Sequence, residues 1–167
     1  NNPKYNTFAN ATQAINWVAK NGNVFEKFLA NRIAPFLQGV KLVIVDDISQ
    51  VPKRFQVDFE GAAGLYYESK AGRTIYLDRA SGINNTIFLH EALHGATMAR
   101  INRFIKDFSN DVAIPKKLED AMVEMHRTMF AAKDRLEALK QLGIADDRVL
   151  ALEKAGAFDD IKEFVAY

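Results

Sequence analysis

Residues 86 to 99 read Thr-Ile-Phe-Leu-His-Glu-Ala-Leu-His-Gly-Ala-Thr-Met-Ala, an apolar run around the pentapeptide at residues 90 to 94. On a helix, His90 and His94 lie four positions apart, so both imidazoles leave the same face one turn apart. Two neutral ring nitrogens placed in this way can bind one Zn²⁺. Glu91 is rotated by roughly 100° from His90, which places its carboxylate beside the metal, where it can take a proton from a bound water. This spacing is typical of zinc-dependent peptide hydrolysis.

The surroundings of the motif favour a metal site over a chance match. Its neighbours on the expected helix are Ile87, Phe88, Leu89, Ala92, Leu93 and Ala96. A helix that is apolar nearly all round is a buried one, whereas a chance match to the motif more commonly lies on a charged, wet face. Burying two imidazoles and a carboxylate is costly unless they are paired or bind a metal.

The composition indicates a single globular domain. The chain has 167 residues, 49% of them hydrophobic, and 12 Phe that can form a core. The 22 basic and 21 acidic residues are well mixed and leave a net charge of +1, so no footprint of nucleic-acid or membrane binding appears. The chain has no Cys, which excludes disulfides and Cys-based zinc sites. No signal peptide or membrane-length apolar run is visible.

The two ends of the chain are unusual for a complete protein. It opens Asn1-Asn2-Pro3 without Met and stops at Phe164-Val165-Ala166-Tyr167 without a polar tail. We therefore expect residues 1–167 to be one domain excised from a longer protein, with the rest of that parent polypeptide as a partner.

The hydrophobic pattern predicts an α+β fold that is mostly helical. In the first half we expect helices over residues 5–20 and 24–37, a buried strand over 40–45 and a hairpin over 62–78. The inward-facing residues expected on the second helix are Phe25, Phe28, Leu29, Ile33 and Phe36. The sheet should be small, with about three strands, and should pack on the helix that carries the motif.

The second half of the chain is expected to be helical throughout. The motif helix should start at Asn84 or Asn85 as N-cap and end near Asp107. Pro115 marks the start of a long helix that continues over residues 118–142. A shorter helix is expected over 147–155, and a last one from Asp159 to Tyr167.

A catalytic zinc site has three protein ligands and one open position, so a third ligand is needed. The extended motif His-Glu-x-x-His-x-x-Gly-x-x-His is absent, because Thr97 and Arg100 stand at its last two positions. The remaining candidates are carboxylates downstream, namely Glu119, Asp120, Glu124 and Glu163. Glu163 stands among apolar residues, although a surface acid on a terminal helix is the alternative for it, whereas Glu119 and Glu124 belong to a charge-rich helix on which an exposed acid is the default.

The pentapeptide, followed far downstream by Glu163-Phe164-Val165-Ala166, resembles the glutamate-liganded zincins (gluzincins). More narrowly, it resembles metallopeptidase-like domains of very large phage-encoded polyproteins, in which a Tyr-containing hairpin strand precedes the motif. The resemblance covers roughly residues 60 to 167 and is specific at the pentapeptide. It implies a zincin-like fold, a Zn²⁺ ion bound by His90, His94 and Glu163, and Glu91 as the general base.

The chain departs from the thermolysin-like pattern at one position. There, an Asp four residues after the ligand Glu supports a zinc-binding histidine, whereas this chain has Tyr167. Support for the histidines is therefore expected to come from another residue.

The expected activity is that of a zinc metalloendopeptidase acting on a peptide or protein substrate. Candidate donors to the oxyanion are His126, Tyr66, Tyr67, Tyr76 and Tyr167, although packing is the simpler role for each. The strand over residues 73–78 is expected to offer an unpaired edge to an extended peptide.

The alternative function is a non-catalytic zinc-binding structural or assembly module of a phage virion protein. Such a module has no need of a general base, so the presence of Glu91 favours the enzyme. The resemblance and the lack of a secretion signal lead us to expect a location in the host cytoplasm or in the virion.

Overall fold

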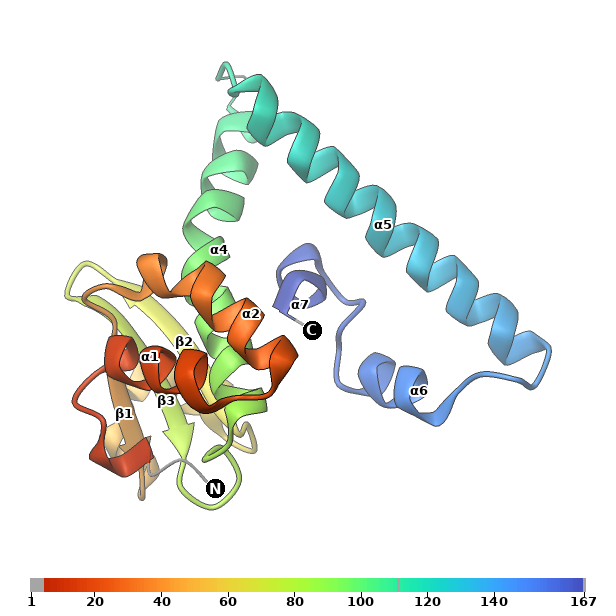
Figure 1. Cartoon of the computed structure of the whole chain (residues 1–167). Coiled ribbons are helices and arrows are strands. Elements are labelled where there is room, and N and C mark those ends of the chain that lie inside the picture. The colour runs from red at the N-terminus through yellow and green to blue at the C-terminus, as the bar shows by residue number, and fades with distance from the viewer. Residues whose placement is uncertain (1–4, 111, 167) are drawn as a thin grey trace. The chain divides into compact units, whose positions relative to one another are not determined.

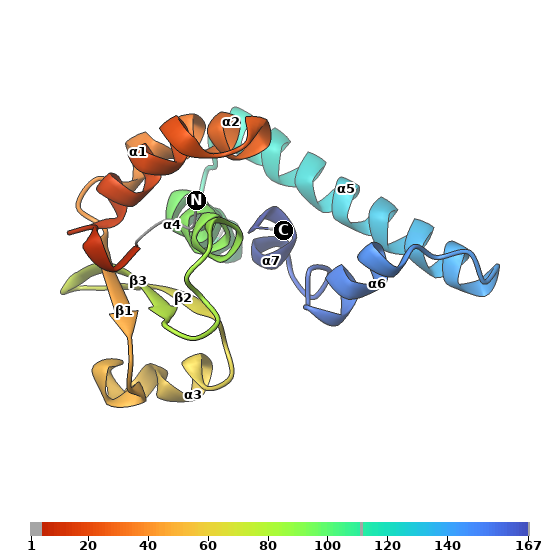
Figure 2. The ribbon, with the colours of Figure 1, turned by 60° about the horizontal axis from the view of Figure 1, so that its bottom comes forward.

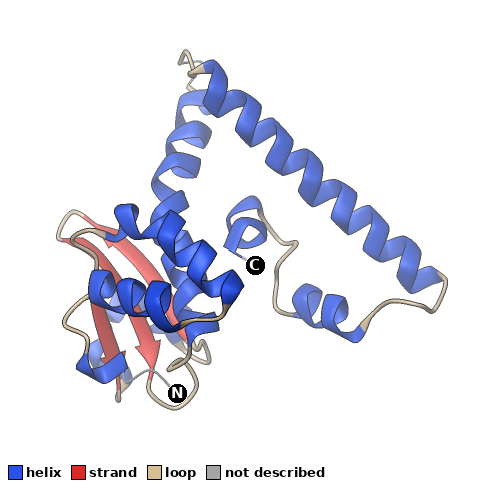
Figure 3. Ribbon diagram, viewed as in Figure 1, coloured by secondary structure: helices blue, strands red, loops and turns tan. Residues whose placement is uncertain are grey.

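The computed structural model describes residues 5–110 and 112–166 (Figure 1). The chain folds as two compact units, one up to Ala96 and the other from Thr97. Helix α4 (Asn85–Ser109) contributes residues to both. The described residues are mostly helical and include a three-stranded mixed sheet, which confirms the predicted α+β class (Figure 3). No helix among them has the length and apolar character needed to cross a membrane.

The sheet of the first unit consists of β1 (Lys41–Val45), β2 (Gly64–Ser69) and β3 (Gly72–Asp78) in the order β1-β3-β2. Strand β1 is parallel to β3, and β2 is antiparallel to it. The predicted hairpin is confirmed. Its turn ends at Gly72, whose φ of 126° is a conformation that residues with a side chain rarely adopt.

The expectation that residues 73–78 present a free edge is wrong. Strand β3 is the central strand and pairs with a neighbour on each side. The alternation of apolar residues predicts which face of a strand is buried, but it does not predict the order of the strands. Within the described sheet, the edges are β1 and β2.

The N-terminal segment forms the 3₁₀ turn η1 (Tyr5–Thr7), helix α1 (Ala11–Asn21), helix α2 (Val24–Ile33) and the 3₁₀ turn η2 (Ala34–Leu37). The helix expected over residues 5–20 thus begins later, because the Asn10 side chain accepts a hydrogen bond from the Gln13 N–H and caps α1. In Figure 2 the sheet lies between α1 and α2 on one side and the short helix α3 (Gln56–Phe59) on the other.

The inward face of α2 differs from the prediction. The buried residues are Ala30, Ile33 and, in η2, Leu37, whereas Phe25 and Phe28 are 69% and 57% exposed. The capping box of Asn23 and Glu26 fixes where α2 starts. Because the apolar residues of α2 occupy more than one face, spacing alone did not identify the buried one.

The face of the sheet next to α3 has its own apolar core. The connection from β1 to β2 runs through the 3₁₀ turns η3 (Ile48–Gln50) and η4 (Lys53–Phe55) before α3. The buried cluster consists of Val45, Val51, Phe55, Phe59 and Tyr76, with Val43, Leu65 and Tyr67 packed against it.

Helix α4 begins where the sequence predicts. The side-chain oxygen of Asn84 accepts a hydrogen bond from the Ile87 N–H at 2.9 Å and caps the helix. Asn85, the other candidate, accepts a hydrogen bond from the Tyr5 hydroxyl at 2.8 Å and donates one to Glu26 at 3.1 Å. These bonds attach the start of α4 to η1 and α2.

The second unit contains the part of α4 from Thr97 onward, together with α5 (Lys116–Gln141), α6 (Asp147–Lys154) and α7 (Ile161–Ala166). Its buried cluster consists of Ile101, Met122, Met129 and Ile161, with Phe104, Leu118, Met125, Phe164 and Val165 packed against it. Helix α7 starts after Asp160, whose carboxylate accepts hydrogen bonds from the N–H groups of residues 162 and 163. The expected end of this helix at Tyr167 lies outside the described residues.

Two phenylalanines of the first unit provide a test of its packing. We expect Phe88→Ala to lower the free energy of unfolding by about 3–5 kcal/mol, because Phe88 is fully buried and its ring lies 5.2 Å from that of Tyr5. Phe25→Ala, at an exposed position, should change it by no more than about 0.5 kcal/mol. Urea unfolding of both variants measures the difference. Equal losses would contradict the packing described for α2 and α4.

Candidate metal centre

The ring nitrogens of His90 and His94 converge. On α4 their Nε2 atoms are 3.1 Å apart, and the ring planes are inclined at 84°. Two nitrogens that bind one tetrahedral Zn²⁺ at 2.0–2.1 Å are separated by about 3.3 Å. His94 is buried and His90 is partly buried. The two imidazoles thus have the spacing that a shared metal ion requires.

The carboxylate of Glu91 lies beside this pair, and the Glu91 side chain is 8% exposed. Its Oε2 atom accepts a hydrogen bond from the main-chain N–H of Tyr66 at 2.6 Å. Its Oε1 atom lies 3.9 Å from Nε2 of His90, which is longer than a hydrogen bond. This is the place that the spacing of the motif predicts for a residue next to a metal ion but not bound to it.

The acidic candidates on α5 are solvated, as expected for a charge-rich helix. Lys116 pairs with Glu119 at 3.6 Å and with Asp120 at 2.8 Å. Arg127 pairs with Glu124 at 3.2 Å. All of these acidic side chains are at least half exposed, so such pairs contribute little to stability.

The fourth candidate, Glu163, belongs to a group that can hold a metal ion. The group consists of His90, His94 and Glu163, and one ligand atom from each lies within 4.8 Å of the other two. Two imidazoles and one carboxylate are a ligand set found in catalytic zinc sites, in which three protein ligands leave a position open.

Two of the tyrosines considered as oxyanion donors have structural roles. Tyr67 and Tyr76 both lie on the sheet face next to α3, where Tyr76 is buried and the ring of Tyr67 contacts Phe55. The guanidinium of Arg54 lies 5.3 Å from the Tyr67 ring. Side chains alternate along a strand, so Tyr66 points to the opposite face from Tyr67.

The hydroxyl of Tyr66 donates a hydrogen bond to Glu68 at 3.3 Å. Burial, and secondarily the Glu68 carboxylate, raise the pKa of Tyr66 to about 12. This phenol therefore stays protonated at neutral pH. Its ring packs against α4, because a Cβ atom at Gly95 would lie 3.1 Å from it.

His126 lies in the second unit. Its Nδ1 atom is 2.8 Å from the main-chain oxygen of Met122, so Nδ1 carries the proton in this arrangement. It lines an apolar pocket whose other residues are Phe104, Ile105, Phe108, Ser109, Met122 and Val123. Tyr167, the remaining candidate donor, is not among the described residues.

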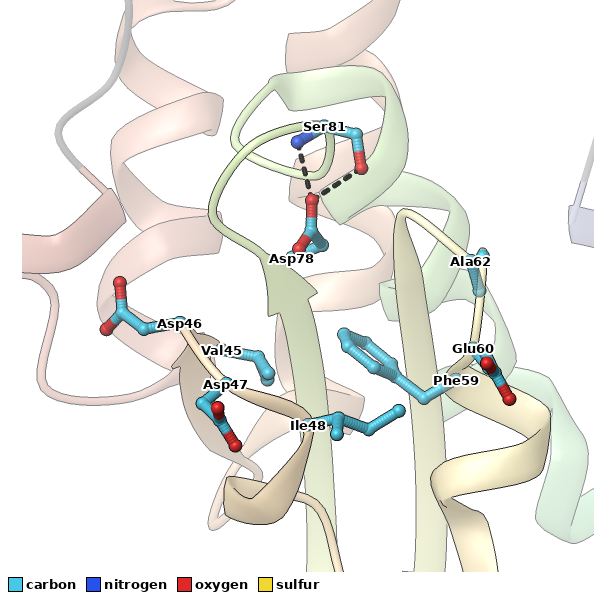
Figure 4. Close-up of a pocket in the computed structure, with 10 residues that line it drawn as sticks. Val45, Asp46, Asp47, Ile48, Phe59, Glu60, Ala62, Asp78 and Ser81 are labelled. Carbon is cyan, nitrogen blue, oxygen red and sulfur yellow. Dashed lines mark hydrogen bonds between the residues drawn. The ribbon is translucent and has the colours of Figure 1, made fainter.

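A pocket at the carboxyl ends of β1 and β3 is lined by Asp46, Asp47, Asp78 and Ser81, among others (Figure 4). Two of its acids serve local structure. Asp46 forms an ion pair with Arg79, which lowers the pKa of the Asp46 carboxyl. Asp78 accepts two hydrogen bonds from Ser81, each 2.7 Å, which lower its pKa.

Sequence reasoning missed two features of β2 beside Glu91, namely Gly64, where a Cβ atom would collide with the Glu91 side chain, and the main-chain N–H of Tyr66, which donates a hydrogen bond to it. A glycine within a strand can mark a close approach of another group, so Gly64 carried a weak signal. A main-chain N–H is present at nearly every residue, so no sequence signal marks the N–H of Tyr66.

No protein-family model, curated protein or solved structure matches the chain. The resemblance to the gluzincins therefore stays a prediction from the residues that carry it. The function has to be inferred from the chemistry of the group around His90, His94 and Glu91.

Proposed function

We propose that this protein is a zinc-dependent metallopeptidase whose ion is bound by His90, His94 and Glu163. One arrangement of side chains carries the proposal. His90, His94 and Glu163 form a group that can hold a metal ion, and Oε1 of the buried Glu91 lies 3.9 Å from Nε2 of His90. A zincin-like arrangement is part of the same proposal.

The donor atoms fit zinc. Imidazole nitrogen and carboxylate oxygen are both zinc ligands, and three of them leave one coordination position for water or substrate. A purely structural zinc site is usually closed by four protein ligands, often Cys, and this chain has no Cys. Mn²⁺, Co²⁺ and Ni²⁺ accept similar ligands, and elemental analysis distinguishes them from Zn²⁺.

When bound, zinc supplies a Lewis acid that brings the pKa of its water towards about 7. Glu91 is the group that takes the proton from the attacking water and passes it to the leaving amine. Its burial keeps bulk water away from the carboxylate, which strengthens its electrostatic interactions. The bond from Tyr66 holds one oxygen and leaves the other on the side of His90.

The proposal is tested by metal analysis and a cleavage assay on the same preparation. We expect close to one zinc ion per chain by elemental analysis, cleavage of members of a random peptide library, loss of cleavage with a chelator and its recovery when zinc is added. A protein that holds zinc but cleaves no peptide would overturn the peptidase proposal and favour the non-catalytic binding module.

Removal of the metal should leave a folded protein. We expect His90→Ala to abolish zinc binding while circular dichroism stays helical, because Phe88, Leu89 and Ala92 are buried on the same helix without help from the metal. Chelation of the wild type should lower its melting temperature, since bound zinc stabilises only the folded state. A random-coil spectrum after chelation would refute this expectation.

A further inference from the structure

The main-chain N–H of Tyr66 points away from β3, at the outer edge of the sheet. The carbonyl of Ala63 accepts a hydrogen bond from the Asp78 N–H at 2.9 Å, and residues 65 and 67 stand opposite 76 and 74 in the same register. In an antiparallel pair, every second residue exchanges hydrogen bonds with its partner strand. In β2 these are the odd-numbered residues, so the N–H of Tyr66 faces outward.

This outward N–H is bound by Glu91 rather than by another strand. The 2.6 Å bond from Tyr66 N to Oε2 is short, as expected for a charged acceptor. Because both groups are buried, water competes poorly for either of them. The bond fixes the rotation of the carboxylate. It therefore also determines that Oε1 is the oxygen on the side of His90.

Gly64 provides the space for this carboxylate. A Cβ atom at Gly64 would lie 2.8 Å from Cγ of Glu91, 3.0 Å from its Oε1 and 2.9 Å from Cγ2 of Ile87. Gly64 is not one of the glycines with positive φ, so its backbone tolerates a side chain. The need for glycine at this position is therefore steric, and it comes mainly from Glu91.

We propose that Gly64 and the main-chain N–H of Tyr66 are positioning elements that hold Glu91 in the orientation used for proton transfer. The effect of this positioning on catalysis rests on the proposed function. The hydrogen bond itself is independent of any activity. Strand β2 thus acts on the reaction through Glu91 and not by touching the reacting atoms.

The first test needs no activity and uses ¹⁵N-labelled protein. We expect the Tyr66 amide of the wild type to exchange slowly with solvent, and Glu91→Ala to accelerate this exchange by at least about tenfold, as expected when a hydrogen bond to a charged group is lost. The amide of Tyr67, which faces β3, should be unaffected and serves as the control. Unchanged exchange at Tyr66 would overturn the proposal.

The second test measures the catalytic consequence. Gly64→Ala should lower kcat by at least about tenfold, with KM, zinc affinity and circular dichroism unchanged, because its Cβ atom displaces the Glu91 side chain and otherwise meets only a methyl group of Ile87, which is no part of the proposed site. In the Glu91→Gln background the same substitution should cause no further loss, since the two changes act on one group. Lys70→Ala, in the exposed turn that follows the same strand, should keep wild-type kcat.

The outcomes separate the two proposals. If wild-type protein cleaves no peptide, the proposed function fails while the exchange experiment still tests the hydrogen bond. If wild type cleaves and Gly64→Ala has wild-type kcat, or if Gly64→Ala slows Glu91→Gln further, the positioning role is wrong and the peptidase proposal stands.

Discussion

Glu91→Gln is expected to lower kcat by at least about 10²-fold while the protein keeps its zinc. Gln has the same length and shape as Glu, and its side-chain oxygen can still accept the hydrogen bond from Tyr66. It cannot take up a proton from water, so only the base is lost. The measurement is kcat on any peptide that wild type cleaves, with zinc content determined on the same samples.

The control for this substitution is Glu124→Gln. Glu124 is an exposed acid on α5 that pairs with Arg127, and its loss should leave both kcat and zinc content near wild type. Turnover by Glu91→Gln equal to that of wild type would remove Glu91 from the mechanism. Loss of zinc from this variant would instead make Glu91 a ligand.

The elements that follow from short-range patterns were predicted well. Asn84 caps α4 because its side chain reaches an N–H three residues on, and this preference is local. The hairpin of β2 and β3 likewise follows from two alternating segments around a short turn. Both predictions depend on residues close together in the sequence.

Except for the start of α1, which the local cap Asn10 determines, the errors concern long-range packing. The central position of β3 depends on β1, which pairs with it from about 30 residues away, and nothing within residues 73–78 encodes that partner. The exposed Phe25 and Phe28 show that a large apolar residue is a poor marker of the buried face when a helix offers several.

The candidate site shows the same division. The convergence of His90 and His94 follows from helix geometry alone. The hydrogen bond from Tyr66 to Glu91 joins residues 25 positions apart through a main-chain group, so sequence carries no mark of it. The solvation of the acids on α5 was predictable, because their neighbours in the helix are themselves charged.

Glu163→Ala is expected to weaken zinc binding by more than about 100-fold, since the loss of a residue that merely supports a ligand already costs about 10–100-fold. Two features support Glu163 as the third ligand. It belongs to the group with His90 and His94 that can hold a metal ion. Helix α7, which carries it, is fixed by Ile161 and its apolar neighbours in the cluster with Ile101 of α4.

The assignment of Glu163 also predicts the effect of a truncation. Removal of the segment from Asp159 onward should abolish both tight zinc binding and cleavage.

Zinc affinities, measured by competition with a chromophoric chelator, decide the matter. Glu119→Ala and Glu124→Ala are the matched controls, because both acids are exposed on α5 and paired with basic neighbours. They should bind zinc within about threefold of wild type, as expected for substitutions at solvated surface positions. If either control loses zinc and Glu163→Ala does not, α5 provides the ligand and the assignment of Glu163 is wrong.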